Sequence, residues 1–291
     1  MDVFIKIFLL LSLFLSAQAW AGWSITSYNI RNFDHDPEAG QTNLTELGKI
    51  VQEFKSDVMT FVEVVNLPAF KKVIAENLPG YTVTSSSCGG FGNQKLAIVF
   101  DPKVFKFISS MEDMTFSGPK STCGDLRPAF LVTLEHKTTN DTYVFAALHL
   151  KAGGSESAMQ ARWAQYELLG KLAKKYKSGN LIMLGDLNTT GYSIQDEDFA
   201  HFDHFLTSAA SKTISENLTC TAYWAGNLST GQHQSSILDH IVLKNEMYDE
   251  VKEIYFGSHC AKLDCNAATP SELGLSYKTV SDHCPIQVIF K

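Results

Sequence analysis

Several features common in proteins of this size are missing from the chain. It has no Cys-x-x-Cys pair, no internal repeat, no low-complexity tract and no proline-rich linker. Cys260 and Cys265 stand apart from any matching set of ligands, which argues against a structural zinc site. No segment after residue 21 is long and apolar enough to span a membrane. The remaining chain of about 270 residues therefore fits one large domain or two modest ones.

The chain also lacks an excess of positive charge. It carries 24 Lys and Arg against 31 Asp and Glu, a formal net charge of −7. Proteins that grip nucleic acid through many phosphates are normally basic, so the composition argues against an extended basic surface. A nuclease is not excluded. An enzyme that visits its substrate and leaves needs only local positive charge, part of which bound divalent cations supply.

The first 21 residues are typical of a secretory signal peptide. Residues 4–15 are nearly continuous apolar sequence, and this core is shorter than the about 20 residues of a spanning helix. Ala-x-Ala cleavage patterns follow at residues 17–19 and 19–21, so a mature start near Gly22 is expected. The alternative, a buried N-terminal helix, is disfavoured by these patterns. A signal peptide implies a secreted or periplasmic protein.

The cysteines agree with export. All of them follow the N-terminal segment: Cys88, Cys123, Cys220, Cys260, Cys265 and Cys284. An even number in an exported chain predicts up to three disulfides, and their pairing stays open.

Segments with strand and helix patterns alternate along the rest of the chain. Apolar residues rich in β-formers predict strands at residues 23–30, 58–65, 81–85, 95–100, 129–135, 143–150, 181–184, 237–243, 251–256 and 286–290. Helical spacing predicts helices over residues 44–54 and 156–176, and Pro68 suits the first turn of a short helix. Asn140-Asp141 predicts a hairpin turn, and residues 257–280 are expected to be loop. The pattern indicates a mixed α/β fold.

Polar residues interrupt or follow several of these apolar segments. They are Asn29, Glu63, His149, Asp186, Asn188, Asp239, Asp282 and His283. Any one of them has a structural explanation, such as a satisfied core histidine or a turn cap. A buried carboxylate is costly unless it is paired or holds a metal, so many such residues are best explained if they partner one another. The pattern predicts a shared acidic and histidine site with oxygen ligands suited to Mg²⁺, Mn²⁺ or Ca²⁺. Six other histidines are expected on the surface or in loops: His35, His136, His201, His204, His233 and His259.

The order of these residues makes the pattern specific. The motifs are Ser27-Tyr-Asn29-Ile, Glu63 at the end of a strand, Leu148-His149-Leu-Lys, Gly185-Asp186-Leu-Asn188, Leu238-Asp239-His-Ile and Ser281-Asp282-His283-Cys-Pro285. Each is weak alone, but in this order the chain resembles the endonuclease/exonuclease/phosphatase superfamily over essentially its whole mature length. The stretch from Gln94 through Arg127 to Arg162 and Gln165 is similar to the deoxyribonuclease-I-like branch, which contains secreted bacterial nucleases.

The resemblance implies a fold. It is α/β, a four-layer α/β/β/α sandwich in which two packed β-sheets are flanked by helices. The expected organisation is a signal peptide over residues 1–21 and one catalytic domain over residues 22–291.

The resemblance also implies roles at the site. Glu63 would be the main metal ligand, with Asn29 and Asp282 nearby. His283 would be the general base that activates water, oriented by Asp239. The expected metal is Mg²⁺, with Mn²⁺ or Ca²⁺ as alternatives.

Further residues would handle the phosphate. His149 would act as an acid or as a phosphate contact. Asp186 and Asn188 would position the phosphate, the attacking water or a second metal. Arg127 would hold a phosphate oxygen, which its planar guanidinium suits. Products of the family carry a 5′-phosphate, and the same is expected here.

One departure from the deoxyribonuclease-I pattern concerns the first histidine. That pattern has a supporting glutamate just before the fifth-strand region. No Asp or Glu lies between Asn77 and Phe100 in this chain. Gln94 or a residue elsewhere must therefore support His149.

The sequence is compatible with three functions. The first is a secreted, metal-dependent nuclease that cleaves DNA, with RNA as a second substrate and little sequence preference, acting as a monomer away from membranes. The second is a phosphodiesterase or phosphatase for a lipid or small phosphoester, as in sphingomyelinase-like or inositol-phosphatase-like relatives, although no convincing membrane-docking hairpin is present. The third is a non-catalytic binding module, which would be expected to lose a catalytic residue. Both histidines and the key carboxylates are present, which disfavours the third function. The deoxyribonuclease-like middle section and the export signal favour the nuclease.

Overall fold

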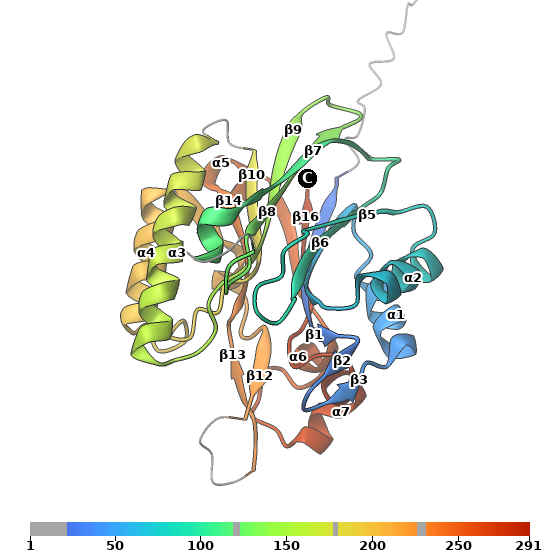
Figure 1. Ribbon diagram of the computed structural model, residues 1–291, viewed down its shortest axis with the longest axis vertical. Helices are drawn as coiled ribbons and strands as arrows, with labels where there is room; N and C mark the ends of the chain where they lie inside the picture. Colours follow the sequence, from blue (N-terminus) through green and yellow to red (C-terminus); the bar gives the residue numbers. More distant parts are fainter. Residues whose placement is uncertain (1–21, 119–122, 177–179, 226–230) are drawn as a thin grey trace, which may run out of the picture.

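Two six-stranded β-sheets packed face to face form the centre of the molecule (Figure 1). The computed structural model describes residues 22–118, 123–176, 180–225 and 231–291. The predicted signal peptide, residues 1–21, lies outside these ranges. Within them, no helix has both the length and the apolar character needed to cross a membrane.

The first sheet has the strand order β15-β16-β1-β4-β6-β5. Its strands are β1 (Ser24–Phe33), β4 (Val58–Val64), β5 (Thr82–Ser85), β6 (Lys95–Phe100), β15 (Val251–Phe256) and β16 (Ile286–Phe290). Helices α1 (Leu44–Glu53) and α2 (Leu67–Asn77) cover its outer face (Figure 1). Each helix begins where an asparagine side chain, Asn43 or Asn66, accepts a hydrogen bond from a first-turn backbone N–H.

The second sheet has the order β11-β14-β10-β9-β8-β7. Its strands are β7 (Phe105–Asp113), β8 (Ala129–His136), β9 (Thr142–His149), β10 (Leu181–Asp186), β11 (Ser211–Thr213) and β14 (Asp239–Lys244). Helices α3 (Glu156–Lys175) and α4 (Glu197–Ser208) cover its outer face (Figure 1). The predicted hairpin is present, since β8 and β9 pair antiparallel on either side of Asn140.

Alternation of side chains along the strands explains the four layers. Val58 and Val62 of β4 face the second sheet, whereas Met59 and Phe61 face α1 and α2. The second sheet repeats this arrangement, with one face in the core between the sheets and the other beneath α3 and α4. The predicted four-layer α/β/β/α sandwich is confirmed.

Short elements complete the described chain. They are β2 (His35–Asp36), β3 (Gly40–Gln41), β12 (Ala222–Trp224), β13 (Gln234–Ser236), α5 (Asn245–Tyr248), α6 (Ser258–Lys262), α7 (Pro270–Thr279) and the 3₁₀ turns Met114–Ser117 and Ile214–Asn217.

The loop predicted for residues 257–280 is wrong, because α6 and α7 lie there. The sequence carried the signal for α7. Pro270 occupies its first turn, and Thr269 and Glu272 form a capping box. The prediction also missed β7, whose side chains are mostly exposed, and α4, whose start is capped by Asp196.

Three disulfides join the cysteines, as their even number predicted. Cys88 pairs with Cys123, Cys220 with Cys265 and Cys260 with Cys284. The last two gather β12, α6, α7 and the segment before β16 into a small buried cluster at one end of the sandwich. The disulfides are typical of an extracellular or periplasmic protein.

Candidate active site

Along several strands, the side chains that face the core between the sheets are mostly apolar until the last one, which is polar. These polar side chains lie at the same end of the sandwich. Ile182 and Leu184 face the core between the sheets, and Asp186 is next in the same row of β10. The rows of β1, β9 and β14 end likewise, in Asn29, His149 and Asp239. All four polar side chains are buried. The alternation that builds the core therefore aims these groups at one another.

Strand register fixes the positions in the second sheet. Asp186 lies directly opposite His149 on parallel β9 and opposite Asp239 on antiparallel β14. Gly185 permits this close pairing. Its φ is +140°, and a Cβ there would lie 1.9 Å from the carbonyl oxygen of Leu148. A side chain at position 185 would push β10 away from β9 just before Asp186.

A bulge brings Glu63 into the site. Its φ is 66°, and near it the pairing of β4 shifts register with both neighbouring strands, β1 and β6. Bulges re-aim a side chain at the cost of local ladder bonds. Here the Glu63 carboxylate turns toward β1, where Oε2 accepts the Asn32 backbone N–H at 2.8 Å.

Glu63, His149 and Asp186 form what we call the carboxylate cluster. Asn29 Nδ2 donates to Glu63 Oε1 and to Asp186 Oδ2, both at 3.0 Å. His149 Nε2 lies 3.5 Å from the same Glu63 oxygen and 3.6 Å from the same Asp186 oxygen. One atom of each cluster member lies within 4.8 Å of the others. Groups from both sheets thus converge on one point.

Burial controls the charges of this cluster. It raises the pKa of Glu63 and, for Asp186, raises the pKa to about 6. Burial, reinforced by the positive charge of Arg127, lowers the pKa of His149 well below its ordinary value. Two adjacent buried carboxylates and a neutral imidazole need a positive partner. The two carboxylates offer hard oxygen donors, which suit a divalent cation of the Mg²⁺ or Mn²⁺ type.

His283 and Asp239 form the second part of the site. His283 Nδ1 lies 2.7 Å from Asp239 Oδ2, and its Nε2 lies 3.8 Å from Asp186 Oδ2. Burial alone would lower the pKa of His283, but the carboxylates of Asp239 and Asp186 outweigh it and hold the pKa well above its ordinary value. Because Asp239 binds Nδ1, the nitrogen that faces the carboxylate cluster is Nε2.

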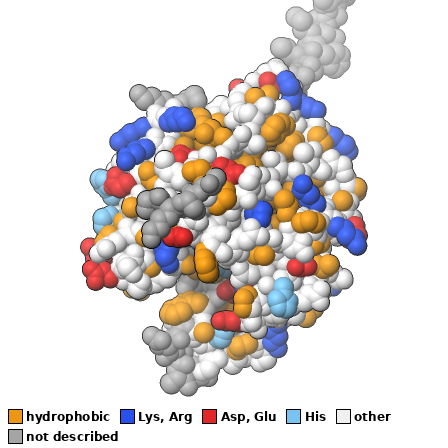
Figure 2. All heavy atoms as spheres, in the orientation of Figure 1, with side chains coloured by type: hydrophobic (Ala, Val, Ile, Leu, Met, Phe, Trp, Pro, Cys, Tyr) orange, Lys and Arg blue, Asp and Glu red, His pale blue; other side chains and the backbone are white. Residues whose placement is uncertain are grey.

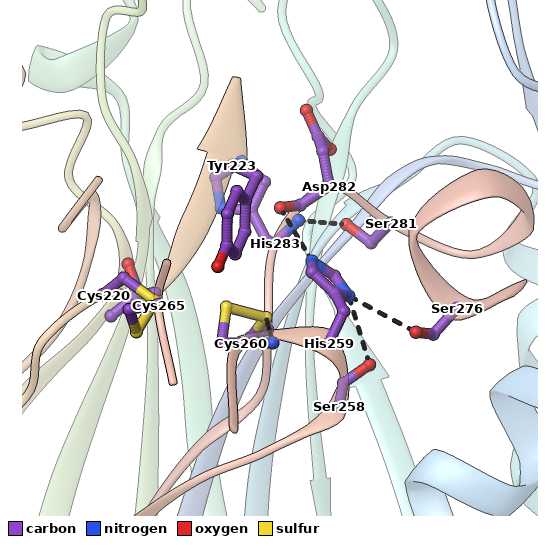
Figure 3. The surroundings of a disulfide bond; sticks show 12 residues. Cys220, Tyr223, Ser258, His259, Cys260, Cys265, Ser276, Ser281, Asp282 and His283 are labelled. Atoms are coloured by element: carbon purple, nitrogen blue, oxygen red, sulfur yellow. Dashed lines mark hydrogen bonds between the residues drawn. A yellow bond between two sulfur atoms is a disulfide. The ribbon is translucent and has the colours of Figure 1, made fainter. Parts of the chain in front are cut away.

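The segment that carries His283 lies outside the regular strands and is held from several sides. The Asp282 carbonyl accepts the Tyr223 backbone N–H at 2.9 Å and lies 3.3 Å from His259 Nε2. Cys284 donates its backbone N–H to the Thr221 carbonyl at 2.8 Å and is bonded to Cys260. Figure 3 shows His259 beside this disulfide, with bonds to Ser258, Ser276 and Asp282.

Thr221 holds both partners of the pair. Its Oγ1 accepts the backbone N–H groups of Leu238 and Asp239, each at 2.9 Å. Its carbonyl binds Cys284, next to His283. Cys220, the preceding residue, is fixed to Cys265.

Other predicted residues lie close by with different contacts. Asn188 donates its backbone N–H to Asp186 Oδ1 at 2.9 Å. Arg127 Nε donates to the His149 carbonyl at 3.0 Å, and its Nη2 donates to that of Leu150. Asp282 Oδ1 lies 4.0 Å from Arg31 Nε, so its carboxylate faces Arg31. Asn29 turns its amide nitrogen toward the carboxylates, while Oδ1 accepts the Arg31 backbone N–H.

Gln94 does not support His149. Its Nε2 donates to Asn32 Oδ1 at 2.8 Å. Among the described residues, the buried Nδ1 of His149 has no hydrogen-bond partner. The missing glutamate of the deoxyribonuclease-I pattern is therefore not replaced in this part of the chain.

Sequence reasoning missed the residues that hold the site together. His259 and His136, expected on the surface or in loops, are buried, with 1% and 7% of their surfaces exposed. Thr221 and Asn32 carried no sequence signal, because their contacts depend on which strands come together. The only hint at His259 was the neighbouring Cys260.

Comparison with known proteins agrees with this architecture. D. rerio TDP2 complexed with a single-strand DNA product has 16% identity and a TM-score of 0.66, covering 93% of this chain and 99% of that chain. The human Nocturnin catalytic domain with bound sulfate has 18% identity and a TM-score of 0.63, covering 93% and 94%. A mannosyl-6-phosphatase from Bacteroides thetaiotaomicron has 20% identity and a TM-score of 0.62, covering 92% and 100%. At these identities the likeness is one of fold.

The family assignment rests on sequence. No curated protein matches the chain. The sequence model of the Endonuclease/Exonuclease/phosphatase family matches residues 26–283, a range that contains Asn29 and His283 and every predicted site residue between them. The chain therefore belongs to the Endonuclease/Exonuclease/phosphatase family, as its motifs predicted.

Proposed function

We propose that the protein is a secreted, divalent-metal-dependent nuclease that hydrolyses phosphodiester bonds of DNA, with RNA as a second substrate, and leaves 5′-phosphates. The observation that carries this proposal is the meeting of a carboxylate cluster and a His–Asp pair, with His283 Nε2 only 3.8 Å from Asp186 Oδ2. Family membership supports metal-dependent phosphoester hydrolysis. The TDP2 relative, complexed with a DNA product, supports nucleic acid as the substrate.

The carboxylate cluster would hold the cation. Glu63 would be the main ligand, with Asp186 beside it. Asp282, whose carboxylate faces Arg31, would have to turn toward the cluster to serve as a further ligand. Asn29 would serve as a ligand with its amide reversed, so that Oδ1 rather than Nδ2 faces Glu63. A bound divalent cation would neutralise negative charge that develops on the phosphate oxygens.

With a bound cation offsetting the carboxylate charge that raises its pKa, His283 would take the proton from the attacking water at Nε2, while Nδ1–H donates to Asp239. The carboxylate fixes the tautomer and stabilises the imidazolium that forms. The water oxygen forms the new P–O bond, the bond to the 3′ oxygen breaks, and that oxygen takes up a proton. The product strand then carries the 5′-phosphate.

The remaining residues would position the phosphate. The lowered pKa of His149 keeps its imidazole neutral. It would therefore contact the phosphate as a neutral hydrogen-bond donor and not as a cation. Arg127 would contact a phosphate oxygen with the guanidinium edge that its two backbone bonds leave unused. Asn188 and Asp186 would orient the water.

Export is part of the same proposal. Residues 1–21 would be removed as a signal peptide, and residues 22–291 would be one catalytic domain that acts as a monomer. The three disulfides support an oxidising compartment.

The test uses residues 22–291 expressed in an oxidising compartment and incubated with supercoiled plasmid. Parallel reactions contain Mg²⁺ plus Ca²⁺, Mn²⁺ or EDTA, and His283→Ala is the contamination control. Metal-dependent nicking that the variant lacks is the expected result. The mannosyl-6-phosphatase relative motivates the second candidate, a small phosphoester substrate. Intact plasmid and intact single-stranded oligodeoxynucleotide with every metal, together with hydrolysis of a sugar phosphate or a lipid phosphodiester, would overturn the nuclease in its favour.

A further inference from the structure

A pocket of about 500 Å³ adjoins the candidate active site. Its walls come from the loop before α3, from α3, from the chain after β10, and from β12, β13 and the residue before β14. The lining residues are Gly153, Gly154, Met159, Asn188, Thr190, Asp196, Trp224, Ser236 and Leu238. This volume is within the range of about 300–1,000 Å³ that small-ligand sites occupy.

The pocket is continuous with the catalytic residues. Asn188 belongs to both, since it lines the pocket and binds the Asp186 carboxylate through its backbone N–H. Leu238 immediately precedes Asp239. Trp224 follows Tyr223, whose backbone N–H binds the Asp282 carbonyl. A group in the pocket would therefore be attached to, or next to, the phosphate at the site.

The walls suit a flat neutral group. Trp224 lines the pocket and is 48% exposed. No Lys or Arg is among the lining residues, all of which lie in the described ranges, so the pocket offers no cation for a second phosphate. The one carboxylate among the lining residues, Asp196, accepts the backbone N–H groups of Asp198 and Phe199 in the first turn of α4. Its charge is partly offset there by the helix N-terminus.

We propose that this pocket receives one unpaired base of the substrate, stacked on Trp224 next to the phosphate that is cut. The proposal rests on the nuclease function above and sharpens its substrate class. In a duplex each base is paired and stacked, so filling the pocket would first cost a few kcal/mol of unstacking. Single-stranded or locally unpaired nucleic acid offers its bases without that cost.

The charge distribution supports the same conclusion. Lys and Arg side chains are spread among acidic ones on the face shown in Figure 2, and the formal net charge is −7. Phosphate contacts alone would therefore give weak binding at ordinary salt. Stacking on an aromatic side chain supplies binding that depends little on base identity. The pocket thus agrees with a nuclease of little sequence preference.

Four phosphodiesters with one leaving group test this proposal. They are the 4-nitrophenyl phosphodiesters of thymidine (its 3′ and its 5′ form), of methanol and of choline. We expect the wild type to favour a thymidine ester over the methyl ester by about tenfold or more in kcat/KM. Trp224→Ala should remove most of that advantage, chiefly through KM, and Trp224→Phe should keep most of it. Tyr255→Ala, an exposed aromatic on β15, is the matched control and should change nothing.

A second measurement compares one oligodeoxynucleotide alone and annealed to its complement. The single strand should be cut faster, and Trp224→Ala should shrink the ratio. Equal rates on the thymidine and methyl esters, or an advantage that survives Trp224→Ala, would overturn the base pocket while leaving the nuclease intact. Preference for the choline ester would overturn it in favour of a quaternary ammonium site. If His283→Ala hydrolysed every one of these esters as fast as the wild type, the proposed function itself would be contradicted.

Discussion

The two parts of the site are positioned in different ways. The carboxylate cluster is fixed by strand register, because Asp186 and His149 are opposite partners in one ladder and Glu63 sits on a bulge of the facing sheet. His283 lies in a short segment (residues 281–284) outside the strands, held by a disulfide and by bonds to Thr221, Tyr223 and His259. The cluster is thus part of the sandwich itself, whereas we expect that the His283 segment could be loosened while the sandwich stays folded.

The largest expected effect comes from removing the base. His283→Ala should lower kcat by about 10²–10⁴-fold or more, because general-base catalysis commonly contributes that much. The fold should survive, since the side chain lies at the end of the core. Initial rates on plasmid, with circular dichroism melting as the control, measure this. A variant with normal turnover would show that the pair is structural.

Glu63→Gln should affect cation binding by the carboxylate cluster. Loss of a charged ligand should weaken cation binding by at least about tenfold, the scale on which even outer partners of metal ligands act. His283→Ala should leave the same titration nearly unchanged, because its Nε2 is not in the cluster around Glu63. Calorimetric titration of Mn²⁺ into both variants compares the two parts directly. Equal binding by wild type and Glu63→Gln would rule out this ligand.

The sequence predicted the carboxylate cluster better than it predicted the segment that carries His283. Asn29, Glu63, His149, Asp186 and Asp239 were visible because polar residues at the ends of apolar strands are costly unless they meet, and strand alternation brings them together. The supports of His283 were not visible. Contacts such as Thr221 with Asp239, or His259 with Asp282, join segments far apart in the sequence, and a short apolar pattern does not specify such pairings. The disulfide pairing was open for the same reason.

Removing individual disulfides should separate catalysis from stability. The Cys260–Cys284 and Cys88–Cys123 bridges span 24 and 35 residues, so each double Cys→Ala variant should lose about 3 kcal/mol of unfolding free energy. Of these two bridges, only the loss of Cys260–Cys284 should also lower kcat, by about tenfold to a hundredfold, since a displacement of about 1 Å can cost a hundredfold in rate. Urea unfolding and steady-state kinetics of both variants measure the two quantities. If both variants lost kcat to the same extent, the His283 segment would be held by the sheets and not by its own disulfide.

The smallest effect concerns acid sensitivity. Burial lowers the pKa of His259 from 6.5 to about 4, so the folded protein keeps it neutral while the unfolded chain takes up a proton. Its contribution to stability is therefore complete above pH 6.5 and is lost as pH falls toward 4, by at most about 1.4 kcal/mol per pH unit.

His259→Gln keeps a donor for the Asp282 carbonyl and removes the titration. The variant should therefore lose less unfolding free energy than the wild type between pH 7 and pH 5, as measured by urea unfolding without metal. His204→Gln, on the exposed side of α4, is the control.

In the carboxylate cluster the change of unfolding free energy with pH has the opposite sign. The raised pKa of Asp186, about 6, gives stability that is present at low pH and lost as pH rises. Identical pH slopes for His259→Gln and wild type would mean that the acid-sensitive part of the protein is not the support of His283.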